Sequence, residues 1–79
     1  MKKHTKIYLD YFGYGEQDFI PCEVCGQKAV DIHHIHGRGK GMDRIDNLMA
    51  LCRSCHELAH NGNYTKKALH LAHIKKTEQ

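Results

Sequence analysis

Two Cys-x2-Cys pairs constrain this chain more than any other feature. Cys22 and Cys25 form the first pair, Cys52 and Cys55 form the second, and the 79-residue chain has no other cysteine. Each pair presents two thiolates to one point, so the two pairs readily converge on a single tetrahedral zinc ion. A chain of this size buries only about 60% of its unfolded surface, so it needs a staple. We therefore predict a structural zinc site, with two disulfides as the alternative.

The start of the chain bears on that choice. No apolar segment with a small-residue cleavage site follows Met1, so we expect no signal peptide, and this favours metal over disulfides. No apolar run approaches about 18 residues, so we expect no membrane span and no membrane partner.

Histidine is the outlier in the composition. The net charge of +3, from 12 Lys+Arg against 9 Asp+Glu, suits a nucleic-acid partner without requiring one. Eight histidines in 79 residues indicate metal or proton chemistry rather than packing. Five of them lie close to the cysteine pairs: His33, His34, His36, His56 and His60.

Both ends of the chain are predicted to be helical. Apolar residues four positions apart predict a short helix in residues 1–20 that packs on the core and ends at Gly13 and Gly15. The alternative role of this segment is a DNA-facing arm that uses Lys2, Lys3 and Lys6. A second helix is expected from a Thr65 cap to about residue 75, with His70 and His73 as solvated or packing side chains.

The segment between these helices has the pattern of a β-hairpin followed by a helix. Residues 29–35 and 48–51 are predicted strands, and residues 36–47 form a glycine-rich, basic, mobile loop between them. Alternation places Asp31 and His33 on one face of the first strand, with His34 at its end. A helix then follows the second cysteine pair, with Ser54 as a candidate N-cap and Gly62 just beyond its end.

This arrangement predicts a second metal site. His56 and His60 lie four positions apart, so both project from one face of the predicted helix. With His33 or His34 they make a three-imidazole site with open positions, the pattern of a catalytic metal, and imidazole suits Zn, Ni, Co or Mn. The His33-His34 doublet points to opposite sides of a strand, so one ring is free to act as a general base.

These elements resemble the HNH (ββα-metal) endonuclease family, in the subgroup with two Cys-x2-Cys zinc knuckles. In that family the first strand ends in Asp-His or His-His, an Asn precedes the second strand, and Leu-Cys-x2-Cys-His opens the helix. Here the matching elements are His33-His34, Asn47 and Leu51 to His56, within about residues 20–62. The resemblance implies a small α+β fold: a zinc-stapled ββα-metal (His-Me finger) core with flanking N- and C-terminal helices.

The resemblance also implies a division of the chain and a role for each matching residue. Residues 1–79 would form a single HNH nuclease domain: a helical arm (1–20), a zinc-bound ββα core (21–62) and a C-terminal helix (63–79). His34 would be the general base, and Asn47 would brace the loop and keep His34 oriented. One catalytic divalent cation (Mg²⁺, Mn²⁺, Ni²⁺ or Zn²⁺) would bind His33, His56 and His60, and the structural zinc would bind Cys22, Cys25, Cys52 and Cys55.

Some of these residues have simpler interpretations. His60 could be a helix-end histidine at the negative end of the dipole, and Asn47 could be a turn residue. Arg38, Lys40 and Arg44 could clamp flanking phosphates or could belong to a solvated loop.

The implied function is metal-dependent hydrolysis of DNA phosphodiester bonds by an endonuclease or nickase, leaving a 5′-phosphate and a 3′-hydroxyl. The DNA would be double-stranded, nicked or branched, and RNA stays open as a substrate. We expect a monomer or weak homodimer in the cytoplasm of a bacterial or phage-infected cell. The alternative is a non-catalytic zinc-binding module that contacts nucleic acid or protein.

Overall fold

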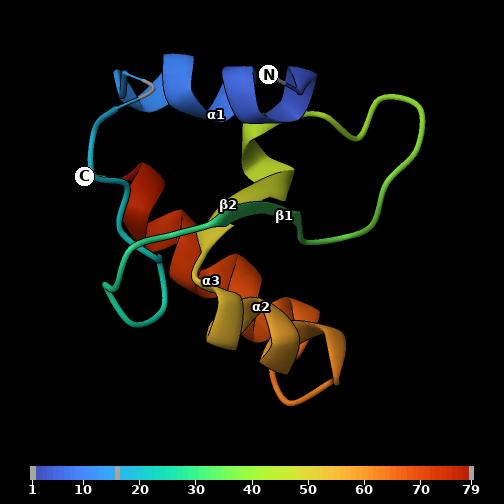
Figure 1. Cartoon of the computed structure of the whole chain (residues 1–79). Coiled ribbons are helices and arrows are strands. Elements are labelled where there is room, and N and C mark those ends of the chain that lie inside the picture. Colours follow the sequence, from blue (N-terminus) through green and yellow to red (C-terminus); the bar gives the residue numbers. More distant parts are fainter. Residues whose placement is uncertain (1, 16, 79) are drawn as a thin grey trace.

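The computed structural model describes residues 2–15 and 17–78. Two antiparallel strands lie between one helix on one side and two helices on the other (Figure 1). This confirms the predicted small α+β fold with a ββα core and flanking helices. The elements in chain order are α1 (Lys3–Phe12), β1 (Asp31–His34), the 3₁₀ helix η1 (Ile45–Asn47), β2 (Leu48–Leu51), α2 (Arg53–His60) and α3 (Lys66–Thr77).

The hairpin of β1 and β2 forms a two-stranded antiparallel sheet, and the helices pack on its two faces. β1 pairs with β2 in a register that places Asp31 opposite Leu51 and His34 opposite Leu48. β1 is shorter than the predicted strand 29–35, although extended pairing continues beyond both of its ends. The Val30 N–H bonds to the Leu51 carbonyl at 3.0 Å, and the Ile35 N–H bonds to the Asn47 carbonyl at 2.8 Å.

Each face of the sheet carries its own apolar cluster, because successive side chains of a strand point to opposite faces. Leu48 and Ala50 of β2 pack with Tyr8 and Leu9 of α1 on one face. On the other face, the side chains that pack together come from β2, α3 and the two knuckles: Met49, Leu51, Leu69, Cys22, Cys52 and Cys55, with Ile35 beside them. The arm helix therefore packs on the core, as its apolar pattern predicted.

The helix ends follow the local sequence with one exception. Gly13, with φ 74°, is the C-cap of α1. Thr65 is the N-cap of α3, and its hydroxyl accepts the Ala68 N–H at 3.1 Å. The prediction that Ser54 caps α2 was wrong. The cap is Cys52, because its sulfur accepts the Cys55 N–H at 3.5 Å, so the helix begins before Ser54 is reached. None of the helices in the described ranges is long and apolar enough to cross a bilayer.

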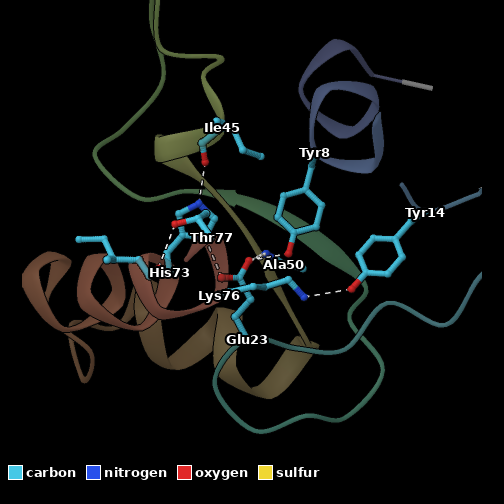
Figure 2. A network of polar contacts seen from close by, with 9 residues as sticks. Tyr8, Tyr14, Glu23, Ile45, Ala50, His73, Lys76 and Thr77 are labelled. Carbon is cyan, nitrogen blue, oxygen red and sulfur yellow. Dashed lines mark hydrogen bonds and ion pairs between the residues drawn. The ribbon is translucent and has the colours of Figure 1, made fainter. Parts of the chain in front are cut away.

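A buried carboxylate, Glu23 of the first knuckle, contacts three other elements of the fold directly (Figure 2). Its Oε2 accepts hydrogen bonds from the Tyr8 hydroxyl and, at 3.0 Å, from the Ala50 N–H. Its Oε1 lies 2.7 Å from Nδ1 of His73, and Nε2 of His73 donates to the Ile45 carbonyl at 2.6 Å. The first knuckle, α1, β2, η1 and α3 are thus held by one network.

The network fixes the charge of His73. Both of its partners are acceptors, so both ring nitrogens must donate, which only the protonated ring can do. Burial is the largest influence on the pKa of His73 and lowers it, but the hydrogen bond to Glu23, the Glu23 charge and the Ile45 carbonyl together outweigh burial, and the net pKa is raised. The side chains are 1% and 0% exposed, so this is a buried ion pair. His73 is therefore a packing histidine, one of the two roles expected for it.

Candidate metal centres and catalytic site

The four cysteines gather into one compact group, the cysteine site. Their sulfur atoms lie within 4.8 Å of one another, and no disulfide joins these four described residues. Sγ of Cys25 and Sγ of Cys52 are 3.6 Å apart, close to the roughly 3.8 Å between two thiolates bound to one tetrahedral zinc ion. Burial raises the pKa of Cys22, but backbone hydrogen bonds of the knuckles outweigh it and hold the pKa at about 7. The donor set and its spacing fit a structural zinc.

The knuckle backbone explains why the sulfurs converge. The Gly26 N–H bonds to the Cys22 carbonyl at 2.9 Å, and Gly26 has φ 82°, a conformation that glycine adopts without strain. In the second knuckle the chain passes directly from β2 into the first turn of α2, where Cys52 caps the helix and Cys55 lies within it. Three of the four cysteines are buried, and Cys25 is exposed.

Three imidazoles form a second group, the histidine cluster of His33, His56 and His60. Their ring nitrogens also lie within 4.8 Å of one another. Nε2 of His56 is 3.0 Å from Nε2 of His60, and the His33 ring lies 5.0 Å and 5.5 Å from the other two rings. Burial, followed by the nearby His56 and His60, lowers the pKa of His33 to about 4, so its lone pair is free at neutral pH. Three convergent imidazoles and an open side fit a divalent transition-metal ion.

Asp31 supports this cluster from the same face of β1. Its Oδ2 lies 3.0 Å from Nδ1 of His56, the ring nitrogen that does not face His60. A carboxylate on the far nitrogen orients a metal-binding histidine and increases its basicity. Strand alternation predicted that Asp31 lies on the same face as His33, but gave it no role. Its two-residue spacing from His33 on the strand was the available signal.

His34 lies on the other face of the sheet, away from the histidine cluster. Its Nε2 is 2.8 Å from Oδ1 of Asp43, and its ring is 4.6 Å from the ring of His4 in α1. Its Nδ1 is buried and has no hydrogen-bond partner among the described residues. The hydrogen bond to His34 lowers the pKa of Asp43, so the carboxylate stays ionised and accepts the proton on Nε2. Neither Asp43 nor His4 was singled out by the sequence.

Asn47 is fully buried, and its side chain holds together the two ends of the loop between the strands. Its Oδ1 accepts the His36 N–H at 2.7 Å. Its amide donates to the carbonyls of Gly37 at 3.2 Å and Met42 at 2.9 Å. One side chain thus closes the loop that carries Asp43, and through Asp43 it is connected to His34.

The three basic loop residues differ in their surroundings. Arg38 lines a cleft of about 260 Å³ between α1 and β1, together with Lys2, Asp31 and His56. Arg44 instead pairs with Asp46 at 3.3 Å, and Lys40 is exposed and does not line the cleft. Of the three basic loop residues, only Arg38 therefore lies beside the histidine cluster. Lys2, which precedes α1, lines the same cleft.

A hairpin and a helix stapled by two cysteine knuckles, with histidines between strand and helix, define a zinc-stapled ββα domain. The model of the HNH endonuclease family matches residues 22–62, which is more than half of the chain, and the protein belongs to that family. Neither a search of curated proteins nor a search of solved structures found a match. Membership implies a nuclease-type activity and a nucleic-acid substrate.

Proposed function

We propose that this protein is a metal-dependent endonuclease or nickase that hydrolyses DNA phosphodiester bonds. The observation that supports this most strongly is the histidine cluster. His33, His56 and His60 offer three convergent imidazoles, and Asp31 orients one of them, which is more than a purely structural zinc domain needs. His34 follows His33 directly in the chain, and its ring, on the opposite face of β1, is the candidate base.

In this proposal His33, His56 and His60 hold the divalent cation. The bound ion supplies charge stabilisation for the phosphate and the leaving 3′-oxygen. Asp43 holds the proton of His34 on Nε2, which leaves the lone pair on Nδ1 to take a proton from the attacking water. That nitrogen is covered in this conformation, so the surrounding side chains must open to admit the water. Asn47 keeps the loop closed and Asp43 in place.

The cleft beside the cluster gives the substrate a place to bind. Lys2 and Arg38 line it and can contact phosphates next to the scissile bond, which positions DNA without reading its sequence. We also propose that the chain functions as one domain, since α1 and α3 both pack on the ββα core. The products would be a 5′-phosphate and a 3′-hydroxyl, as in the family.

The test is nicking of supercoiled plasmid by purified protein with Mg²⁺, Mn²⁺ or Ni²⁺, with and without chelator. His34→Ala should lower the rate by about 10²- to 10⁴-fold, the usual contribution of a general base. His70→Ala is the matched control, because His70 lies on α3 and contacts His36 rather than the cluster. Absence of nicking with every metal would favour the non-catalytic zinc module, and full activity of His34→Ala would show that His34 is not the base. An RNA of the same sequence, assayed in parallel, tests the choice of DNA.

A further inference from the structure

Three side chains from separate parts of the chain meet on the α1 face of the sheet. His4 comes from the first turn of α1, His34 from the end of β1, and Asp43 from the loop before η1. Their nitrogen and oxygen donor atoms all lie within 4.8 Å of one another, and Nε2 of His34 is 2.8 Å from Oδ1 of Asp43. We propose that this group, the His4 cluster, is a second open site for a transition-metal ion.

The spacing is close to what one ion requires. Two ligands bound at about 2.1 Å to a tetrahedral ion lie roughly 3.4 Å from each other. Nε2 of His34 and Oδ1 of Asp43 are 2.8 Å apart and no pair of donors is more than 4.8 Å apart, so modest side-chain rotations bring the three donors onto one ion. The histidine cluster has a similar geometry, with 3.0 Å between Nε2 of His56 and Nε2 of His60.

An independent observation concerns His34. Asp43 occupies one of its ring nitrogens, while Nδ1 is buried and has no partner in the part of the chain that the structure describes. Buried polar atoms are nearly always partnered, and an exception indicates a catalytic role or a bound water or ion. The described protein therefore does not fully satisfy the His34 ring. An ion shared with His4 and Asp43 would bind Nε2, the nitrogen that faces Asp43, and would place the ring proton on Nδ1.

The donor types select the ion. Two imidazoles and one carboxylate suit Zn²⁺, Co²⁺ or Ni²⁺ and leave a position open, whereas Mg²⁺ and Ca²⁺ prefer oxygen ligands throughout. The positive charge of Arg38 opposes a cation at both open sites, and that of Lys2 adds to it beside His4. The His4 cluster should therefore fill last, after the cysteine site and the histidine cluster.

Filling the site has a consequence that rests on the proposed function. His34 would be both the general base and a ligand of the second ion, so a bound ion would occupy the base. Activity supported by Mn²⁺ should then fall when Zn²⁺ is added in excess, by about a hundredfold, the lower range for loss of a general base. Excess Mg²⁺ should not produce this inhibition.

The site itself is tested by binding, without reference to catalysis. Zn²⁺ is titrated calorimetrically into protein whose cysteine site is already loaded, and the wild type should take up two further ions, the second more weakly. His4→Ala should lose the weaker event and keep the stronger one, and His33→Ala should do the reverse. Asp43→Asn, which preserves the size of the side chain, is a second test if His4→Ala folds poorly. His70→Ala should keep both events.

Each other outcome overturns the proposal. Uptake of a single further ion by the wild type would mean that the His4 cluster binds none. A weaker event that survives His4→Ala and Asp43→Asn, or that disappears in His70→Ala, would place the ion elsewhere. The two proposals fail separately: a second ion bound by a protein that cleaves nothing rejects only the nuclease. Nicking by a protein that binds no second ion rejects only this site.

Discussion

The cysteine site and the histidine cluster occupy neighbouring parts of one ββα core but differ in construction. The cysteine site offers four sulfur ligands, enough to close a tetrahedral shell, and three of the four cysteines are buried. The histidine cluster offers three ligands, none of them buried, and borders a cleft. A closed shell can only stabilise the fold, whereas an open one leaves room for substrate and water. Substitutions should therefore affect stability at the first site and chemistry at the second.

The largest expected effect is at the cysteine site. Cys22→Ser should release the zinc and unfold the protein, because apparent zinc-binding energies of about 10–16 kcal/mol are folding energy in such small domains. Far-UV circular dichroism and metal content measure the outcome. His60→Ala is the matched control and should stay folded with its zinc, since His60 is exposed. A folded, zinc-free Cys22→Ser protein would remove the distinction between the two sites.

The next effect concerns the buried ion pair that supports the cysteine site. Glu23→Ala leaves the His73 ring and the Tyr8 hydroxyl without their acceptor, and we expect a loss of about 3–5 kcal/mol in unfolding free energy. Urea denaturation gives the value. Glu57→Ala, at an exposed position of α2, should stay within about 0.5 kcal/mol of the wild type. Equal values for the two variants would show that the pair does not hold the fold.

The same pair predicts a pH dependence. The pKa of His73 is raised above its ordinary 6.5, so its stabilising charge is fully present below about pH 6.5 and is lost as pH rises through the folded-state pKa. The difference in unfolding free energy between wild type and His73→Gln should therefore shrink as pH rises from 6. Using this difference cancels the pH dependence of zinc binding, which both proteins share. A difference that grows with pH would contradict the assignment of a protonated ring.

Local patterns predicted most of the fold and the members of two clusters. Cysteine spacing, strand alternation at His33 and the four-residue step from His56 to His60 each act within one element, so they can be read from sequence. The partners Asp43, His4 and Glu23 were missed, because their contacts join residues far apart in the chain. Ser54 was misread for a related reason: the cap is a sulfur that the zinc knuckle places there.

A smaller effect is expected at Asp31, which orients His56. Asp31→Ala should weaken metal binding at the histidine cluster by about 10- to 100-fold, the usual cost of losing such a partner. Its side chain is 48% exposed, so the fold should be retained. Titration of Co²⁺ into the zinc-loaded protein measures the affinity. Asp46→Ala, at an exposed carboxylate that pairs with Arg44, should leave the affinity unchanged. Unchanged affinity in Asp31→Ala would mean that the carboxylate does not support the site.

The smallest effect separates the basic residues of the loop. Arg38 lines the cleft beside His56, while Arg44 pairs with Asp46. If Arg38 contacts one phosphate, Arg38→Ala should reduce the slope of log affinity for double-stranded DNA against log salt by about 0.9. Arg44→Ala should leave that slope unchanged, because its charge is already paired away from the cleft. Fluorescence anisotropy at several salt concentrations, with Ca²⁺ to prevent cleavage, measures both. An equal reduction of the slope in the two variants would mean that DNA binds the charges of the whole loop and not specifically the cleft beside the histidine cluster.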